Sequence, residues 1–426
     1  MKPSQLSKPA LWLVLAMLSA LSTEFYTVKI WAANQPAGFS DLYASWWAAH
    51  ELLLHGRDPY SSAISHEIQT GIYGTPVDPS PEDPTGIGGG FAYPPHAAIL
   101  FWPLVYLTFP SAQKVFLCVS LLGTLLSLTI WMDALGFRRL PLLWLSVTIF
   151  TLGSFPALQA FKLQNPSLIA AALIALTLCC LSSGHFISAG IFLSICTFKP
   201  QFTVALIPWL ALWTIADWRR RRSLAWSFLA TMLLLGAVSA WLVPGWMASF
   251  LTVIRAYRHY TYGHSVLDVW FTPGIGSVAS ALLLVAALTL CRPHRSESPS
   301  SPKFLVATSL ILAATVVVIP TLAPHAQLLL LPGFLCLLRS PNFRWTPSRF
   351  TRTFRSAGWM LLAWPWIAAV GLFLAAVVYP TANLLRFWEV PLYTSPLVPL
   401  AVLLALSWLI RDGAKSGEPQ PSIPEP

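Results

Sequence analysis

Long apolar stretches separated by short polar segments dominate this chain of 426 residues. A helix that crosses a lipid bilayer needs about 20 consecutive, mostly apolar residues. About twelve stretches approach that length: 11–31, 112–132, 141–160, 165–183, 185–198, 200–216, 224–243, 276–291, 303–320, 326–338, 358–379 and 395–411. Because a backbone in lipid must satisfy its own hydrogen bonds, we predict an all-α polytopic membrane protein with about twelve transmembrane helices.

The composition excludes the other classes of protein. Charged residues make up 10% of the chain and hydrophobic residues 56%, whereas a soluble domain has about 25% charged residues. The many aromatic and aliphatic side chains equally exclude an intrinsically disordered chain. The net charge is +10, but the basic residues do not gather in one soluble segment, so we expect no nucleic-acid partner. The six cysteines form no CxxC pair and no Cys/His cluster, so we expect neither a disulfide framework nor a bound metal.

The basic residues predict the orientation in the membrane. With the N-terminus in the cytoplasm, 18 of the 26 Lys and Arg residues fall on the cytoplasmic side, including the run Arg219–Arg222, as the positive-inside rule requires. Segment 97–109 has only 13 residues and contains Pro103. As a full span it would move Arg219–Arg222 outside, so we expect a re-entrant or tilted segment. We predict a multi-pass protein of the cytoplasmic membrane with both termini inside.

In this topology residues 1–411 form a single membrane domain and 412–426 a disordered cytoplasmic tail. Residues 32–96 become the first extracytoplasmic loop and 244–275 the second outer loop. Within the first loop, residues 41–56 predict an amphipathic helix, because Leu42, Trp46, Ala49 and Leu53 follow helical spacing. Ser40 or Asp41 can cap its start, and Gly56 ends it. We expect this helix to lie on the outer membrane surface.

Several short motifs follow one another along the chain. Asp41 comes just after the first apolar stretch, and the predicted helix ends in Gly56-x-Asp58-Pro59-Tyr60. Further along stand Tyr93-Pro94-Pro95, Leu163-Gln164-Asn165, Ala189-Gly190, Phe198-Lys199-Pro200-Gln201 and Ala323-Pro324-His325. In this order, over about residues 11–340, the chain resembles glycosyltransferase family 87, which has the type C glycosyltransferase (GT-C) fold.

The resemblance implies a function. Enzymes of this family transfer a hexose, typically mannose, from a polyprenyl-phosphate donor to a hydroxyl group outside the cytoplasmic membrane. The expected partners are therefore the lipid-linked donor, a glycan, glycolipid or other acceptor, and the bilayer, and no cofactor is expected. Two alternatives stay open at this point: a lipid or solute transporter or flippase, and a family member that has lost catalysis.

The motifs also supply candidate site residues. The resemblance implies that Asp41 is the general base, although an aspartate at a helix start is also a plain N-cap. Lys199 lies at an apparent membrane boundary, where a charge is costly. We expect it to bind the donor phosphate, with snorkelling to the interface as the alternative. His325 is expected to bind the phosphate or to assist Asp41.

The remaining candidates are expected to bind substrate. Arg255 and Arg258 lie in the second outer loop against the positive-inside trend, and are alternative phosphate ligands. Five further residues complete the predicted binding set: Tyr93, Gln164, Asn165, Asp58 and Tyr60. We expect Tyr93 and Gln164 to orient hydroxyl groups of the sugar or acceptor. Asp58 also fits a residue that builds the turn after the helix.

Overall fold

The computed structural model describes residues 40–81, 83–137, 141–261, 263–319, 324–339, 349–379 and 381–415. Within these ranges the regular structure is entirely helical, which agrees with the predicted fold class. The predicted first span, 11–31, lies outside the described residues. The predicted disordered tail is only partly covered, and its first residues, 412–415, continue a helix rather than a disordered segment.

The first loop folds into two helices, α2 (Asp41–His55) and α3 (Ser62–Tyr73). The short helix α4 (Ala97–Phe101) and the 3₁₀ turn η3 (Trp102–Leu104) follow in segment 97–109. The predicted bounds of α2 are confirmed, and Gly56 ends it in the left-handed conformation that glycine favours. Its predicted apolar face, with Leu42, Trp46 and Ala49 buried, packs against α3, α4 and η3. Protein therefore covers that face, and a position on the membrane surface is not confirmed.

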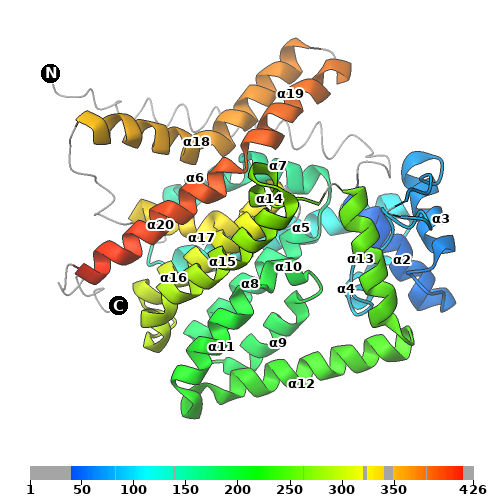
Figure 1. Ribbon diagram of the computed structural model, residues 1–426, viewed down its shortest axis with the longest axis horizontal. Coiled ribbons are helices and arrows are strands. Elements are labelled where there is room, and N and C mark those ends of the chain that lie inside the picture. Colours follow the sequence, from blue (N-terminus) through cyan, green and yellow to red (C-terminus); the bar gives the residue numbers. More distant parts are fainter. Residues whose placement is uncertain are drawn as a thin grey trace.

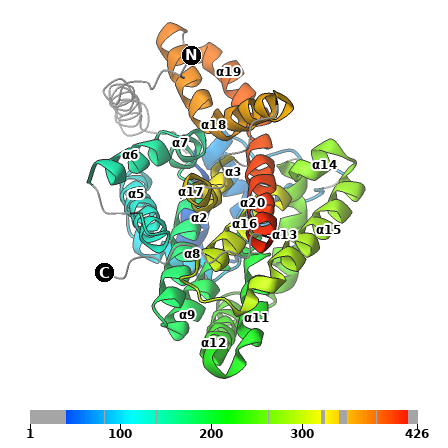
Figure 2. The same ribbon diagram turned by 90° about the vertical axis from the view of Figure 1, so that its left-hand side faces the viewer.

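The centre of the molecule is a set of packed apolar helices (Figures 1 and 2). They are α5 (Phe109–Ala134), α8 (Ser167–Ser182), α9 (Phe186–Cys196), α11 (Leu206–Ala216), α15 (Pro273–Cys291), α16 (Pro302–Val318), α17 (Leu331–Arg339) and α20 (Leu397–Lys415). α16 is buried along almost its whole length and contacts α15, α17 and α20. It forms the core on which the other helices pack.

The predicted count of twelve spans is not confirmed. Among the described residues, four helices are long and apolar enough to cross a membrane, or five if α6 (Pro141–Leu152) and α7 (Phe155–Lys162) form one span bent by 61°. The apolar stretches are broken where proline begins a new helix, at Pro156 in α7 and at Pro200 in α10 (Pro200–Thr203). Proline lacks the N–H that would continue the preceding helix. Segment 97–109 holds only α4 and η3 and is not a full span, as expected.

The second outer loop is helical rather than irregular. It contains α13 (Trp246–Tyr260) and α14 (Val266–Trp270), which follow the long helix α12 (Trp218–Leu242). The remaining described elements are η4 (Arg292–Ser296), η5 (Pro324–Leu330), α18 (Arg349–Val378) and α19 (Thr381–Thr394).

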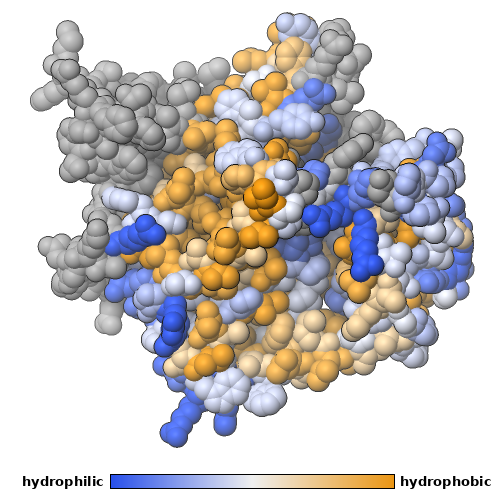
Figure 3. Space-filling model, in the orientation of Figure 1, coloured by the Kyte–Doolittle hydropathy of each residue, from blue (hydrophilic) through white to orange (hydrophobic). Residues whose placement is uncertain are grey.

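The outer surface carries large apolar side chains. Leu233 and Trp241 on α12 and Leu282 on α15 are each more than 60% exposed. Figure 3 shows hydrophobic residues spread over this face. Such an exposed apolar surface is characteristic of helices that contact lipid, so this surface supports a membrane-integral protein.

Candidate functional site

The turn between α7 and α8 is the centre of the candidate site. The backbone N–H of Asn165 donates to the backbone carbonyl oxygen of Ala160. The backbone N–H of Gln164 donates to the backbone carbonyl oxygen of Phe161. This is the Schellman pattern of a helix end, which needs one left-handed residue. Gln164 takes that position with φ 52°, the only non-glycine residue with positive φ among those described. Strained backbone of this kind is concentrated at functional sites.

This turn fixes the start of α2. The backbone amide of Asp41 donates to the carbonyl oxygen of Leu163 at 2.7 Å. Ser40 Oγ donates to Gln164 Oε1 at 2.5 Å, and Gln113 Nε2 donates to the same oxygen at 3.1 Å. The side-chain oxygen Oε1 of Gln164 is therefore occupied by two protein donors. This buried side chain positions the start of α2.

Asp41, Asn165 and Lys199 form a continuous polar chain. Asn165 Nδ2 donates to Asp41 Oδ2 at 2.5 Å, and Asn165 Oδ1 accepts from Lys199 Nζ at 2.7 Å. Lys199 Nζ also donates to Ser167 Oγ at 2.6 Å. Asp41 is the first residue of α2, and neither it nor Ser40 makes a side-chain cap bond to the helix. The N-cap alternative for Asp41 is therefore wrong, and its carboxylate faces the α7–α8 turn instead.

Burial shifts the pKa values of Asp41 and Lys199 away from those of exposed groups. Burial raises the pKa of Asp41, although the bond from Asn165 and the charge of Lys199 act in the opposite direction. Burial lowers the pKa of Lys199 to about 7, against the attraction of Asp41. A carboxylate of raised pKa is a stronger base, and a lysine of lowered pKa changes charge near neutral pH.

Both groups keep hydrogen-bonding capacity for a ligand. An ammonium group has three N–H donors, and Lys199 uses two of them, on Asn165 and Ser167. Asp41 Oδ1 accepts no hydrogen bond from the part of the chain that the structure describes, since only Oδ2 is engaged. The arrangement can therefore accept a proton at Asp41 and bind an anion at Lys199.

His325 lies at the start of η5, close to Lys199. Burial and the charge of Lys199 hold the pKa of His325 well below its usual range, so the imidazole is neutral at neutral pH. Its Nδ1 is buried and has no hydrogen-bond partner among the described residues. A buried ring nitrogen without a partner is unusual and leaves His325 able to bind a substrate group.

The predicted first-loop residues have different surroundings. Tyr60 Oη donates to the carbonyl oxygen of Tyr93 at 2.6 Å, which joins two of the sequence motifs. The ring of Tyr93 stacks on Phe198, beside Lys199. Asp58 is exposed, and its Oδ1 accepts from the backbone amide of Tyr60 at 2.9 Å. Asp58 therefore builds the turn after α2.

Helix α13 turns a tyrosine, not its arginines, toward Asp41. Arg255 and Arg258 are exposed, and Arg258 Nε donates to the carbonyl oxygen of Gly263. Tyr257 is half-buried, and its pKa is raised by burial and then by the charge of Asp41. Neither Tyr257 nor Ser167 was predicted from the sequence. The 3.6-residue helix period places Tyr257 on a different face from Arg255 and Arg258, but only the fold shows which face meets the site.

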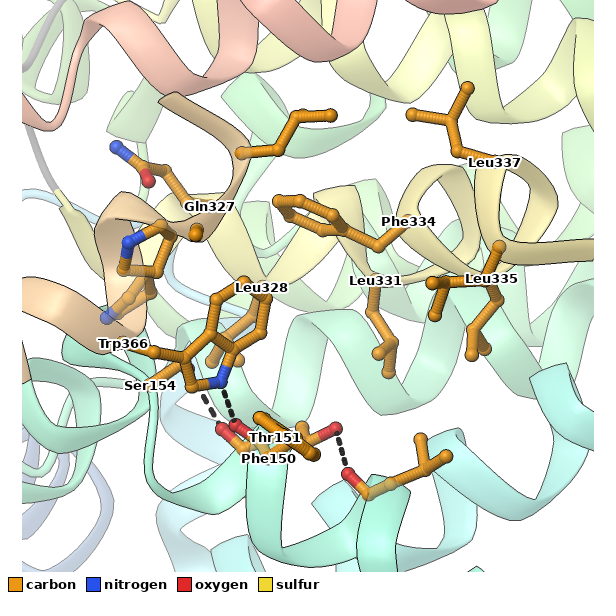
Figure 4. Close-up of a pocket in the computed structure, with 16 residues that line it drawn as sticks. Phe150, Thr151, Ser154, Gln327, Leu328, Leu331, Phe334, Leu335, Leu337 and Trp366 are labelled. Carbon is orange, nitrogen blue, oxygen red and sulfur yellow. Dashed lines mark hydrogen bonds between the residues drawn. The ribbon is translucent and has the colours of Figure 1, made fainter. Parts of the chain in front are cut away.

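An apolar cavity adjoins this region. It has a volume of about 280 Å³ and is lined by residues of α6, α7, η5, α17 and α18. Figure 4 shows Gln327 at one end, Leu337 at the other, and Phe334 and Trp366 between them. Trp366 Nε1 donates to the carbonyl oxygen of Phe150, which joins α18 to α6 across the cavity. Since Gln327 follows His325 by two residues, the cavity and the polar site share η5.

Comparison with known proteins now gives the family. Residues 91–341 match the family model for Glycosyltransferase family 87, which is more than half of the chain. The chain belongs to glycosyltransferase family 87. The resemblance predicted from the motifs is thereby confirmed, and membership favours a membrane glycosyltransferase over a transporter. No curated protein and no solved structure matches the chain.

The family match covers only part of the candidate site. It includes Asn165, Lys199 and His325, whereas Asp41, in the first loop, precedes it. Asp41 belongs to the site because its backbone and carboxylate are both bonded to the α7–α8 turn.

Proposed function

We propose that this family 87 glycosyltransferase transfers a hexose, mannose being the first choice, from a polyprenyl-phosphate donor to an acceptor hydroxyl on the extracytoplasmic face. The observation that carries the proposal is the chain of hydrogen bonds from Asp41 through Asn165 to Lys199. It holds a carboxylate with a free oxygen and an ammonium group with a free N–H in one site. Glycosyl transfer from a phosphate donor needs both of these groups.

The chemistry follows from the two groups. Asp41 Oδ1 accepts the proton of the acceptor hydroxyl while the hydroxyl oxygen attacks the anomeric carbon of the donor sugar. The bond between that carbon and the phosphate oxygen breaks, and the electron pair leaves with the polyprenyl phosphate. Lys199 binds the phosphate as its negative charge increases. Neutral His325 hydrogen-bonds to the same phosphate or to the sugar. Asn165 holds the base and the phosphate ligand at a fixed separation.

The apolar cavity suits the lipid tail of the donor. It starts at Gln327, two residues from His325, and continues along α17 between apolar side chains. A polyprenyl chain in this cavity would place its phosphate at the polar site. The burial of each CH₂ group contributes about 0.8 kcal/mol, so even part of the chain adds substantial affinity.

The direct test uses the purified protein in lipid vesicles with synthetic polyprenyl-phosphate mannose and a panel of sugar acceptors. We expect release of polyprenyl phosphate coupled to a new glycosidic bond, detected by mass spectrometry. Polyprenyl-phosphate glucose in a parallel reaction tests the choice of sugar. Failure to transfer from any polyprenyl-phosphate hexose, in a folded preparation, would contradict the proposal.

The lipid cavity has its own test. Leu331→Trp enlarges a half-buried side chain in the cavity wall. We expect the donor KM to rise about tenfold or more for a long-chain donor, which corresponds to the loss of about two buried CH₂ groups. A donor analogue with a short chain should be affected less. Leu233→Trp on α12, 75% exposed and outside the cavity, is the matched control. Equal kinetics for Leu331→Trp and wild type with the long-chain donor would show that the lipid tail of the donor does not bind in this cavity.

The membrane orientation is also part of the proposal. Single cysteines at Thr75 and Ser300, both exposed positions, in a background without native cysteines, should react from opposite sides of the cytoplasmic membrane. We expect the Thr75 variant to react with an impermeant reagent in intact cells and the Ser300 variant only after lysis. Labelling of both from outside would contradict an extracytoplasmic active site with cytoplasmic termini.

A further inference from the structure

Two histidines and a glutamate meet in the last part of α2, away from Asp41 at its start. His50 Nδ1 lies 3.1 Å from Glu51 Oε1, and His55 Nδ1 lies 3.5 Å from the same oxygen. The three potential ligand atoms all lie within 4.8 Å of one another. Two imidazoles are thus directed at one carboxylate oxygen.

These distances fit the ligands of a single metal ion. Zinc binds imidazole nitrogen at about 2.0–2.1 Å and carboxylate oxygen at about 2.0–2.2 Å. Two ligand atoms of one tetrahedral zinc ion are therefore about 3.3–3.5 Å apart. The two nitrogen–oxygen distances here are 3.1 and 3.5 Å. His55 is the last residue of α2 and its side chain is 52% exposed, so it can rotate to complete the geometry.

The surroundings fix the glutamate in the required orientation. Its second oxygen, Oε2, accepts from Arg57 Nη1 at 2.8 Å, and Arg57 also binds Glu67. The ring of Trp47 stacks on His50. Carboxylate ligands in metal sites are held by hydrogen bonds from such neighbouring residues. Glu51 is buried, whereas His55 is open to solvent, which provides an entry path for an ion.

We propose that His50, Glu51 and His55 bind a divalent transition metal ion, with Zn²⁺ the best fit to two imidazoles and one carboxylate. Water completes the coordination. Glu51 follows Asp41 by ten residues along α2, a distance of about 15 Å, so the ion takes no part in chemistry at Asp41. Its role is structural: all three ligands belong to α2, so the ion fixes the last part of this helix, where Glu51 also accepts from Arg57.

The test is a zinc titration of the full-length protein, purified in detergent without a polyhistidine tag and stripped with a chelator. A chromogenic chelator that competes for Zn²⁺ reports the affinity. We expect one Zn²⁺ per chain. We expect His55→Gln and His50→Gln each to weaken binding at least tenfold, since loss of a residue that merely orients a ligand already costs about 10–100-fold. His185→Gln, an exposed histidine at the start of α9, is the matched control and should bind like wild type.

The ion's surroundings give a second readout. Co²⁺ in place of Zn²⁺ should show the intense visible absorption of a tetrahedral site, and this absorption should be lost in His55→Gln. His55 is exposed, so that variant is expected to fold. The proposal is overturned if wild type shows no saturable Zn²⁺ binding, or if His55→Gln binds Zn²⁺ as tightly as wild type. In either case the three side chains form only a hydrogen-bonded network with Arg57.

Discussion

Helix α2 carries two carboxylates in opposite electrostatic surroundings. Asp41, at its first position, receives a hydrogen bond from a neutral amide, and burial raises its pKa. Glu51, in its last part, is penalised by burial, but hydrogen bonds from Arg57 and His50 outweigh that penalty and lower its pKa. Environments that shift two pKa values apart mark different roles. The neutral partner of Asp41 therefore leaves its carboxylate basic, whereas the cationic partner of Glu51 makes that carboxylate a fixed structural anion.

The largest expected effect follows when each of the two carboxylates is neutralised in turn. Asp41→Asn keeps the shape but cannot accept a proton. We expect the rate of transfer to fall at least 100-fold, within the range of about 10²–10⁴ for lost general-base catalysis. Glu51→Gln, the matched control on the same helix, should retain transfer within a few-fold. Donor binding to a folded Asp41→Asn protein should persist. A transfer rate within tenfold of wild type for that variant would exclude Asp41 as the base.

The next effect concerns the phosphate ligand. Lys199→Ala removes a charged hydrogen-bond donor, and such a bond is worth about 1.5–3 kcal/mol. We therefore expect the donor KM to rise about 10- to 100-fold, with the acceptor KM little changed, in steady-state kinetics. Arg258→Ala, which removes an exposed cation on α13, is the control. If Arg258→Ala raises the donor KM and Lys199→Ala does not, the phosphate site belongs to α13.

The pH dependence of transfer refines the same assignment. The value of kcat/KM should fall at low pH, as Asp41 becomes protonated at its raised pKa, and at high pH, as Lys199 loses its proton above a pKa of about 7. Arginine stays charged at all accessible pH values. We therefore expect Lys199→Arg to lose the alkaline decline while it keeps the acidic one. If the decline of kcat/KM at high pH is unchanged in Lys199→Arg, that decline belongs to a group other than Lys199.

Glu51 is expected to affect stability rather than rate. Its pKa is lower in the folded protein than the ordinary value of 4.5. The ionised carboxylate therefore stabilises the fold above about pH 4.5, and this contribution is lost as the pH falls through the folded pKa. We expect Glu51→Gln to have a lower melting temperature than wild type at pH 7. In acid the two melting temperatures should become similar. Both are measured in detergent with a chelator present. A melting temperature for the variant equal to wild type at pH 7 would contradict this role.

The smallest expected effect concerns the bond that holds the start of α2. Ser40→Ala removes the hydrogen bond to Gln164 Oε1, and a neutral hydrogen bond is worth about 1 kcal/mol. We expect kcat to fall about fivefold or less, because the backbone bond from Asp41 to Leu163 remains. A loss as large as that of Asp41→Asn would show that Ser40 does more than position the helix.

The sequence predicted the local features of this protein better than its long-range ones. The bounds of α2 and its end at Gly56 were predicted because capping and hydrophobic spacing are local signals. The motif residues Asp41, Asn165 and Lys199 were each predicted, but not that Asn165 bridges the other two. That contact joins residues 124 positions apart, and only the packing of α2 on the α7–α8 turn creates it.

The failures have physical reasons as well. Hydrophobicity alone cannot show where an apolar stretch breaks, so the 61° bend between α6 and α7 was missed. The convergence of His50, Glu51 and His55 also escaped prediction. Their spacing matches no common ligand motif, and side-chain rotation at the helix end brings them together.

The bond between the Asp41 amide and Leu163 has an evolutionary consequence. The α7–α8 turn, within the family match, fixes the position of the carboxylate. The glycine- and proline-rich stretch 71–90 of the first loop packs on α13 instead, where Gly88 and Gly89 contact Tyr260. Insertions and deletions in that stretch can therefore accumulate without displacing the base. A change of length in that stretch is thus separated from the geometry of the Asp41 carboxylate, which Leu163 and Asn165 determine.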